Sequence, residues 1–130
     1  MILLDTDVCI ELLRGNKKVI ERRSACNDDV ALSLMTVAEL FYGAEKSEKK
    51  EKNLTLVEKF IISLNIIQTD ISILKKFGEL KATLETGGLP VSDADIMIAA
   101  TTITKCQKLI TGNTRHFEKF EGLAIENWIR

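Results

Sequence analysis

Short apolar runs alternate with segments of helical periodicity along this chain of 130 residues. A short apolar run is typical of a buried strand, and apolar residues that recur every three or four positions indicate one face of a helix. Strands that alternate with helices favour a parallel sheet with helices on both of its faces. We therefore predict an α/β fold, a three-layer α/β/α sandwich with a central, mainly parallel sheet of four to five strands.

The boundaries of the expected elements follow from the same periodicity. Helices are predicted at residues 8–13, 37–44, 54–64, 73–84 and 92–103. Strands are predicted at residues 2–4, 30–35, 65–68 and 109–111, with residues 123–128 as an edge strand or a docked tail. Because 45% of the residues are hydrophobic and 28% are charged, with a single proline, we expect one globular domain over residues 1–130.

The cysteines and the apolar segments exclude several classes of protein. Cys9, Cys26 and Cys106 are widely spaced, with no Cys-x-x-Cys pair and no neighbouring histidine, so we predict reduced thiols rather than a zinc site. The start of the sequence lacks the basic and apolar regions of a signal peptide. No apolar run approaches the roughly 20 residues of a membrane span. The expectation is a cytoplasmic protein without membrane contact.

The charge balance limits how the chain could meet nucleic acid. A net charge of −1 disfavours nonspecific coating of nucleic acid through a general basic surface. A nuclease remains open, because an enzyme needs phosphate contacts only near its cleft. Basic residues between Arg14 and Arg23 either supply such contacts or form a solvated helix face.

Acidic residues gather at the predicted strand-to-helix turns. Asp5 and Asp7 follow the first strand, Glu39 lies in the first turn after the second, and Asp93 and Asp95 begin the helix after a Gly-Gly-Leu-Pro turn. In an open parallel sheet, ligands bind in the crevice outside the carboxyl ends of the strands. Acids that are distant in the sequence are therefore expected to converge on one pocket.

Each acid also has a purely structural explanation. The Thr36–Glu39 segment matches a capping box, in which a hydroxyl and a carboxylate satisfy free amides at a helix start, and the Ser92–Asp95 segment is similar. Carboxylates at helix N-termini are also favoured by the helix dipole. Asp5 fits this explanation poorly, because a carboxylate that ends an apolar strand loses hydration unless a cation or hydrogen bonds compensate.

Several carboxylates in one crevice would repel one another, and a divalent cation is the natural counter-charge. Oxygen ligands without histidine or thiolate select Mg²⁺ or Mn²⁺ over zinc. Such a site suits phosphodiester cleavage by activated water. The only histidine, His116, follows Arg115 in the turn after the fourth strand, where it either touches phosphate or is an ordinary loop residue.

Short motifs in a characteristic order extend this interpretation. They are Leu-Asp-Thr-Asp with Cys-Ile at 4–10, Thr-Val-Ala-Glu-Leu and Tyr-Gly-Ala-Glu-Lys-Ser within 36–47, Asp95 with Ile-Ala-Ala at 98–100, Leu-Ile-Thr and Asn-Thr-Arg-His-Phe within 109–117, and Gly-Leu and Asn-Trp within 122–128. Together they resemble the PIN domain family, and within it the VapC-like toxins, nearly from end to end.

The resemblance implies a metal-dependent endoribonuclease, the toxin of a type II toxin–antitoxin pair. It implies that Asp5, Glu39 and Asp95 are the catalytic acids and hold Mg²⁺ or Mn²⁺, with Asp5 and Asp95 as the principal ligands. Supporting roles fall to Thr6, Asp7, Asp93 and Asn113. RNA contacts are expected from Arg14, Arg115 and His116.

The resemblance also implies partners and one departure from the family pattern. The expected partners are an RNA substrate, a cognate VapB-like antitoxin and a second copy of the chain in a homodimer, with DNA bound only through the antitoxin. Many PIN domains carry a fourth acid where this sequence has Asn113. An amide can orient water or phosphate but adds no charge, so we predict one well-occupied metal site.

Three alternative functions account for parts of the sequence. Asp5-Thr6-Asp7 has the Asp-x-Asp form of haloacid-dehalogenase-like phosphatases, but their late Gly-Asp pair and lysine are missing. A phospho-receiver domain would use Asp70 after the third strand, but no suitable lysine follows the last strand and Glu39 would have no role. A PIN fold that binds RNA or a partner without cleavage is disfavoured by the complete set of acids.

Overall fold

The computed structural model describes all residues, 1–130, and contains one five-stranded sheet with the strand order β3-β2-β1-β4-β5. Every neighbouring pair of strands is parallel. The predicted parallel sheet of four to five strands is therefore confirmed. The strands are β1 (Ile2–Leu4), β2 (Val30–Ser33), β3 (Asn65–Ile67), β4 (Leu109–Ile110) and β5 (Ile125–Glu126).

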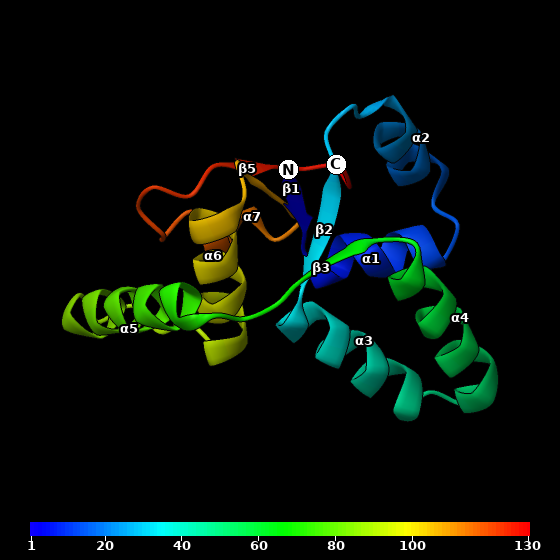
Figure 1. Cartoon of the computed structure of the whole chain (residues 1–130), viewed down its shortest axis with the longest axis horizontal. Helices are drawn as coiled ribbons and strands as arrows, with labels where there is room; N and C mark the ends of the chain where they lie inside the picture. The colour runs from blue at the N-terminus through cyan, green and yellow to red at the C-terminus, as the bar shows by residue number, and fades with distance from the viewer.

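Seven helices surround this sheet (Figure 1). They are α1 (Thr6–Leu13), α2 (Lys17–Ala25), α3 (Leu34–Glu45), α4 (Lys50–Ile62), α5 (Ile71–Thr86), α6 (Asp93–Lys105) and α7 (Thr114–Phe117). The two hydrophobic cores show that α1 to α4 pack on one face of the sheet and α5 to α7 on the other. This is the expected α/β/α sandwich. No helix has both the length and the apolar character needed to cross a membrane.

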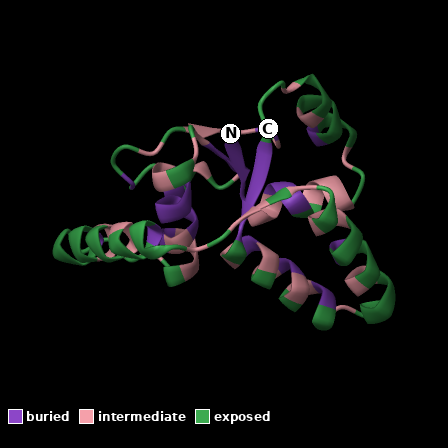
Figure 2. Ribbon diagram, in the orientation of Figure 1, coloured by how far each residue is buried: buried purple, intermediate pink, exposed green.

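The alternation of side chains along the strands produces the two cores. Ile2 and Leu4 belong to the core shared with α1 to α4, whereas Leu3 belongs to the core shared with α5 to α7. All three are fully buried, and burial of each such side chain contributes roughly 1.5–3 kcal/mol. Figure 2 shows the buried strands between helices whose outer faces are exposed.

The second strand is shorter than predicted, and this changes the interpretation of Glu39. Helix α3 begins at Leu34, because Ser33 Oγ accepts a hydrogen bond from Thr36 N at 3.0 Å and so caps the helix. The capping box predicted for Thr36–Glu39 is therefore wrong. Glu39 lies beyond the first turn of α3, so its carboxylate is not needed for capping.

Two helices were missed by the periodicity. Helix α2 is capped by Asn16, whose Oδ1 accepts from Lys18 N and Val19 N, and Val19 is its only buried residue. A helix with one buried residue has no apolar stripe to detect. Helix α7 is a single turn placed where we expected only a polar turn.

The three cysteines are free, as predicted, but only Cys9 is buried, whereas Cys26 and Cys106 are partly exposed.

Candidate active site

Asp5 is the acid at the centre of the site, at the end of β1 and at the N-cap of α1. Its Oδ1 accepts a hydrogen bond from Thr6 N at 2.8 Å, and its Oδ2 accepts from Thr111 Oγ1 at 2.7 Å. Only 6% of the residue is exposed. Burial, reinforced by the negative charges of Asp7 and Asp95, raises the pKa of Asp5 to about 7. The site thus holds a buried carboxyl group that is costly to ionise.

The sheet register explains why Thr111 reaches Asp5. Strand β1 lies between β2 and β4, and Leu4 pairs with Ile110. The next residues along these two strands are Asp5 and Thr111, so they emerge side by side at the carboxyl edge. Sequence analysis missed Thr111 as a site residue. A hydroxyl at a strand end was visible, but its importance depends on knowing that β4 neighbours β1.

Asp7, the second acid of the cluster, connects α1 to the turn after β4. Its Oδ1 accepts from Val8 N at 2.7 Å, and its Oδ2 accepts from Gly112 N at 2.9 Å. Burial raises the pKa of Asp7, an effect that the hydrogen bond from Gly112 opposes. Asp7 also lines a pocket with Arg115. Both carboxylate oxygens therefore have backbone donors, which makes Asp7 a supporting residue of the turn.

We expect Gly112→Ala to disturb this turn. A Cβ atom at residue 112 would lie 2.6 Å from Ile129 Cδ1 and 2.9 Å from Asp7 Oδ2. Both atoms are side-chain ends, which can move aside if Ile129 repacks and the hydrogen bond from Gly112 N to Asp7 Oδ2 loosens. We therefore expect a loss of about 1 kcal/mol, which urea unfolding would measure. Gly78→Ala is the matched control, because a Cβ there meets nothing within 4 Å and a helical alanine adds roughly 0.5–1 kcal/mol of stability. Equal stability changes in the two variants would contradict the tight fit at Gly112.

Glu39 faces the start of α1 from helix α3. Thr6 Oγ1 donates a hydrogen bond to Glu39 Oε1 at 2.7 Å and lies 3.1 Å from Thr36 Oγ1. The supporting role expected of Thr6 therefore has a structural basis, since its backbone N–H contacts Asp5 and its hydroxyl contacts Glu39. Glu39 also lines a groove with Arg14. This groove places one of the basic residues predicted to contact RNA beside one of the predicted catalytic acids.

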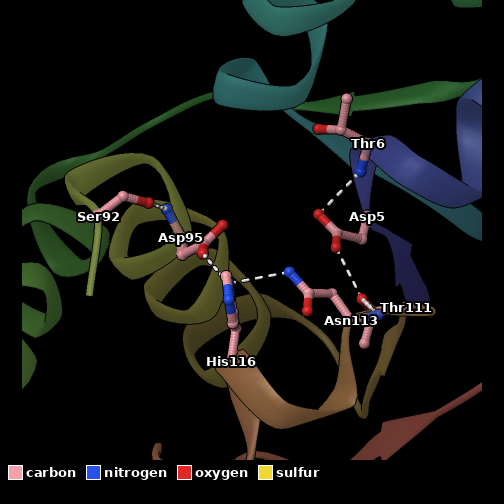
Figure 3. A network of polar contacts seen from close by, with 7 residues as sticks. All are labelled: Asp5, Thr6, Ser92, Asp95, Thr111, Asn113 and His116. Atoms are coloured by element: carbon pink, nitrogen blue, oxygen red, sulfur yellow. Dashed lines mark hydrogen bonds and ion pairs between the residues drawn. The ribbon is translucent and has the colours of Figure 1, made fainter. Parts of the chain in front are cut away.

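Asp95 approaches Asp5 from the other core, at the start of α6. Ser92 Oγ accepts from Asp95 N at 3.2 Å, which confirms Ser92 as the cap of this helix. The Asp95 carboxylate does not return to Ser92; its Oδ2 lies 3.2 Å from His116 Nδ1. Figure 3 shows the carboxyl groups of Asp5 and Asp95 extending toward each other from β1 and α6.

The structure does not bring every predicted residue to this cluster. Asp93 is exposed and forms an ion pair with Lys81 at 2.9 Å, so its carboxylate is paired outside the Asp5 cluster. Arg22 lines a separate pocket with Asp28 and Lys108, residues that precede β2 and β4. The Arg22 guanidinium also donates to the Asn127 carbonyl oxygen, so this arginine of α2 does not line the pockets of the predicted catalytic acids.

Asp70, the residue that a receiver domain would phosphorylate, has an ordinary structural role. It caps α5 by accepting from Ile73 N at 3.1 Å, and it forms an ion pair with Lys105 at 2.6 Å. The hydrogen bond from Lys105, with a further one from Ser72, lowers the pKa of Asp70. An exposed cap that is paired with lysine offers no acidic pocket, so the receiver hypothesis loses its only phosphorylation candidate.

Carboxylates are suitable ligands for a divalent cation, but the side chains of these acids are not arranged around one ion. No group of three or more His, Cys, Asp or Glu side chains is arranged to hold a metal ion. Glu39 and Asp95 instead contact Thr6 and His116. Even so, Asp5 is surrounded by like charge, and no lysine or arginine forms an ion pair with it. Buried carboxylates without a counter-charge are the donor set that a hard cation would stabilise.

The class of structure is thus an open parallel α/β sheet with a cluster of acids outside the carboxyl end of its central strand. The family model of the PIN domain matches residues 2–123, and the chain belongs to the PIN domain family.

Among curated relatives, the chain is 36% identical over 127 residues to the tRNA(fMet)-specific endonuclease VapC of Salmonella typhimurium. The alignment covers 97% of this chain and 96% of that protein. It is 34% identical over 128 residues to ribonuclease VapC2 of Haemophilus influenzae, with 98% and 97% covered.

Solved structures agree with this relationship. DNA-bound VapBC from Salmonella typhimurium superimposes with a TM-score of 0.92 at 35% identity, covering 98% of this chain and 97% of that chain. VapBC2 from Rickettsia felis, bound to a fragment of its promoter DNA, superimposes with a TM-score of 0.91 at 32% identity, covering 98% and 99%. The relatives are nucleases, which agrees with the function expected from the motifs.

Proposed function

We propose that this chain is a metal-dependent endoribonuclease and the toxin of a type II toxin–antitoxin module. The observation that carries the proposal is the buried Asp5, which ends the central strand with its pKa raised beside Asp7 and Asp95. Burial and neighbouring charge make the Asp5 carboxyl group costly to ionise. Such a group lowers the stability of the fold, so folding by itself does not explain its presence. Such groups are retained where they bind a cation or perform chemistry.

In this proposal, Asp5, Glu39 and Asp95 hold the ion, which is Mg²⁺ or Mn²⁺ because all ligands are carboxylate oxygens. The bound ion would activate water and neutralise charge on the phosphate. Thr6 and Thr111 fix the direction of the Asp5 carboxylate, and Thr6 also fixes Glu39. Preorganised ligands of this kind lose little freedom when the ion binds.

The basic side chains beside the acids suit an RNA backbone. Arg14 lines the groove that contains Glu39, and Arg115 lines the pocket that contains Asp7. Guanidinium groups pair with phosphate oxygens through two hydrogen bonds. We propose that these two arginines hold the phosphates on either side of the cleaved bond. Since relatives are tRNA(fMet)-specific endonucleases, structured tRNA in the cytoplasm is the substrate class we propose.

The related VapBC complexes support a partner for this chain. We propose a VapB-like antitoxin that inhibits the enzyme and carries the DNA contact, together with a homodimer of the chain, whose residues 1–130 form one domain. A division of labour of this kind agrees with the net charge of −1, which gives the chain itself no general affinity for DNA.

Asp95→Asn and Asp93→Asn form a matched pair that tests the function. Both change an acid in the first turn of α6, but Asp95 faces the acidic cluster whereas Asp93 pairs with Lys81. We expect Asp95→Asn to lower tRNA cleavage at least about 100-fold, because loss of a metal ligand removes several kcal/mol of transition-state stabilisation. Asp93→Asn should cleave within about twofold of the wild type, since exposed ion pairs contribute little.

The assay uses purified chain freed from any antitoxin, with initiator tRNA and either Mg²⁺, Mn²⁺ or EDTA. Cleavage that needs metal and survives only in Asp93→Asn supports the proposal. Cleavage that persists in EDTA, or equal losses in the two variants, would exclude a metal site built on Asp95. Wild-type protein that binds Mn²⁺ but cleaves no RNA would favour a binding module instead.

A further inference from the structure

Asp95 has an unusual partner for an acid at a helix start. Its Oδ2 lies 3.2 Å from His116 Nδ1, and no lysine or arginine forms an ion pair with it. The Asp95 side chain is 21% exposed and the His116 side chain 56% exposed. The partly buried carboxylate is therefore held by the only imidazole in the chain, which arrives from a different element.

The hydrogen-bonding capacity of the ring determines what this contact is. A carboxylate can only accept, so contact with Asp95 requires the His116 tautomer that carries its proton on Nδ1. Asn113 Nδ2 lies 2.9 Å from the same nitrogen. Nδ1 carries at most one hydrogen, so it either donates to Asp95 or accepts from the Asn113 amide. The contact with Asp95 uses that hydrogen, which leaves Asn113 Nδ2 as a close neighbour of the ring and not as a second hydrogen-bond partner.

The turn between β4 and α7 sets the position of His116 relative to Asp5. Thr111 Oγ1 donates to Asp5 Oδ2 at 2.7 Å and accepts from Asn113 N at 2.9 Å. Asn113 in turn contacts His116, which contacts Asp95. Figure 3 shows the contact of Asp5 with Thr111 and the contacts of His116 with Asn113 and Asp95. The two principal acids are thus connected through one short turn.

Helix α7 is anchored in the core even though the His116 ring is exposed. The neighbouring Phe117 is fully buried, and its ring centroid lies 5.9 Å from that of Phe120. A buried aromatic anchor holds the backbone of the turn, so the attachment point of the His116 side chain is fixed beside Asp95.

We propose that His116 is a positioning residue for Asp95, and that it holds Oδ2 so that Oδ1 remains free for the cation. This inference rests on the proposed function and deepens it. Residues that orient a metal ligand through a hydrogen bond typically change metal affinity by 10- to 100-fold when they are lost. The role differs from the RNA contact that the sequence suggested for His116.

His116→Ala and His116→Gln separate positioning from RNA contact. Calorimetric titration with Mn²⁺ alone, on the full chain at one fixed pH, should show that His116→Ala binds about 10-fold more weakly. The amide N–H of glutamine can still donate to Asp95, so His116→Gln should stay within about threefold of the wild type. Excess Mn²⁺ should restore tRNA cleavage by His116→Ala, with KM for tRNA unchanged.

Other outcomes would overturn the inference. Unchanged Mn²⁺ affinity with a raised KM for tRNA would make His116 an RNA contact, and no change in either would make it an ordinary surface residue. Equal losses in His116→Ala and His116→Gln, both folded by circular dichroism, would exclude a donated hydrogen bond as the cause. Failure of the proposed function is distinguishable, because Asp95→Asn would then leave Mn²⁺ binding of the chain unchanged.

Discussion

Asp5→Asn is expected to abolish RNA cleavage and, at the same time, to stabilise the metal-free protein. Asparagine retains an oxygen for the hydrogen bond from Thr6 N, but it removes the negative charge that a cation requires. Loss of several kcal/mol of transition-state stabilisation corresponds to roughly a thousandfold slower cleavage. Initial rates on tRNA at saturating Mg²⁺ would measure this loss.

The gain in stability follows from the environment of the carboxyl group. Holding Asp5 ionised at pH 8, with a pKa of about 7 in place of 3.8, costs the folded state roughly 4 kcal/mol. A neutral side chain avoids this cost but weakens the hydrogen bond from Thr111, by about 1–2 kcal/mol. We therefore expect a net gain of about 2–3 kcal/mol in the free energy of unfolding, measured with urea in EDTA.

The matched control for stability is Asp93→Asn, whose exposed carboxylate pairs with Lys81. Its free energy of unfolding should change by less than about 0.5 kcal/mol. A destabilised but inactive Asp5→Asn would mean that the Asp5 carboxylate supports the fold through Thr6 and Thr111. In that case loss of activity would no longer identify Asp5 as a metal ligand.

The fold was predictable because its signals are local. The apolar run Ile2–Leu4 predicts a strand, and the apolar stripe of α5, with its period of 3.6 residues, predicts a helix. Both predictions use only residues that are close in the sequence. The acids were predictable for a related reason, since strand ends in a parallel sheet share one edge. Asp5 and Asp95 come together in the structure as expected from their places in the order of elements.

What could not be predicted depends on which elements are neighbours. Thr111 matters because β4 lies beside β1, and His116 matters because α7 packs near the start of α6. Neither adjacency is encoded in a local pattern. The prediction of a capping box at Thr36–Glu39 was wrong for a different reason. Ser33 and Thr36 are both good caps three residues apart, and only the end of the strand shows that Ser33 is used.

The stability of the metal-free protein should fall as pH rises from 5 to 8. The folded pKa of Asp5, about 7, lies above its ordinary value of 3.8, so the folded state holds the proton more tightly than the unfolded chain. The loss begins near pH 4, where the unfolded chain releases its proton, and is complete above about pH 7, where folded Asp5 releases its own. It amounts to roughly 4 kcal/mol over that whole range, of which roughly 3 kcal/mol falls between pH 5 and 8. Asp7, whose pKa is also raised, acts in the same direction.

Mn²⁺ should oppose this pH dependence, because a cation binds the ionised carboxylates and competes with protons. At 100 times its dissociation constant, a ligand of the folded state adds about 2.7 kcal/mol, so the stabilisation by Mn²⁺ should be large at pH 8 and small at pH 5. Urea unfolding between pH 5 and 8, with EDTA or Mn²⁺, tests both expectations. Asp70 does not interfere, since its lowered pKa affects stability only below this range. A metal-free stability that is flat with pH, or equally steep in Asp5→Asn, would show that Asp5 is not the group that couples proton and metal binding to folding.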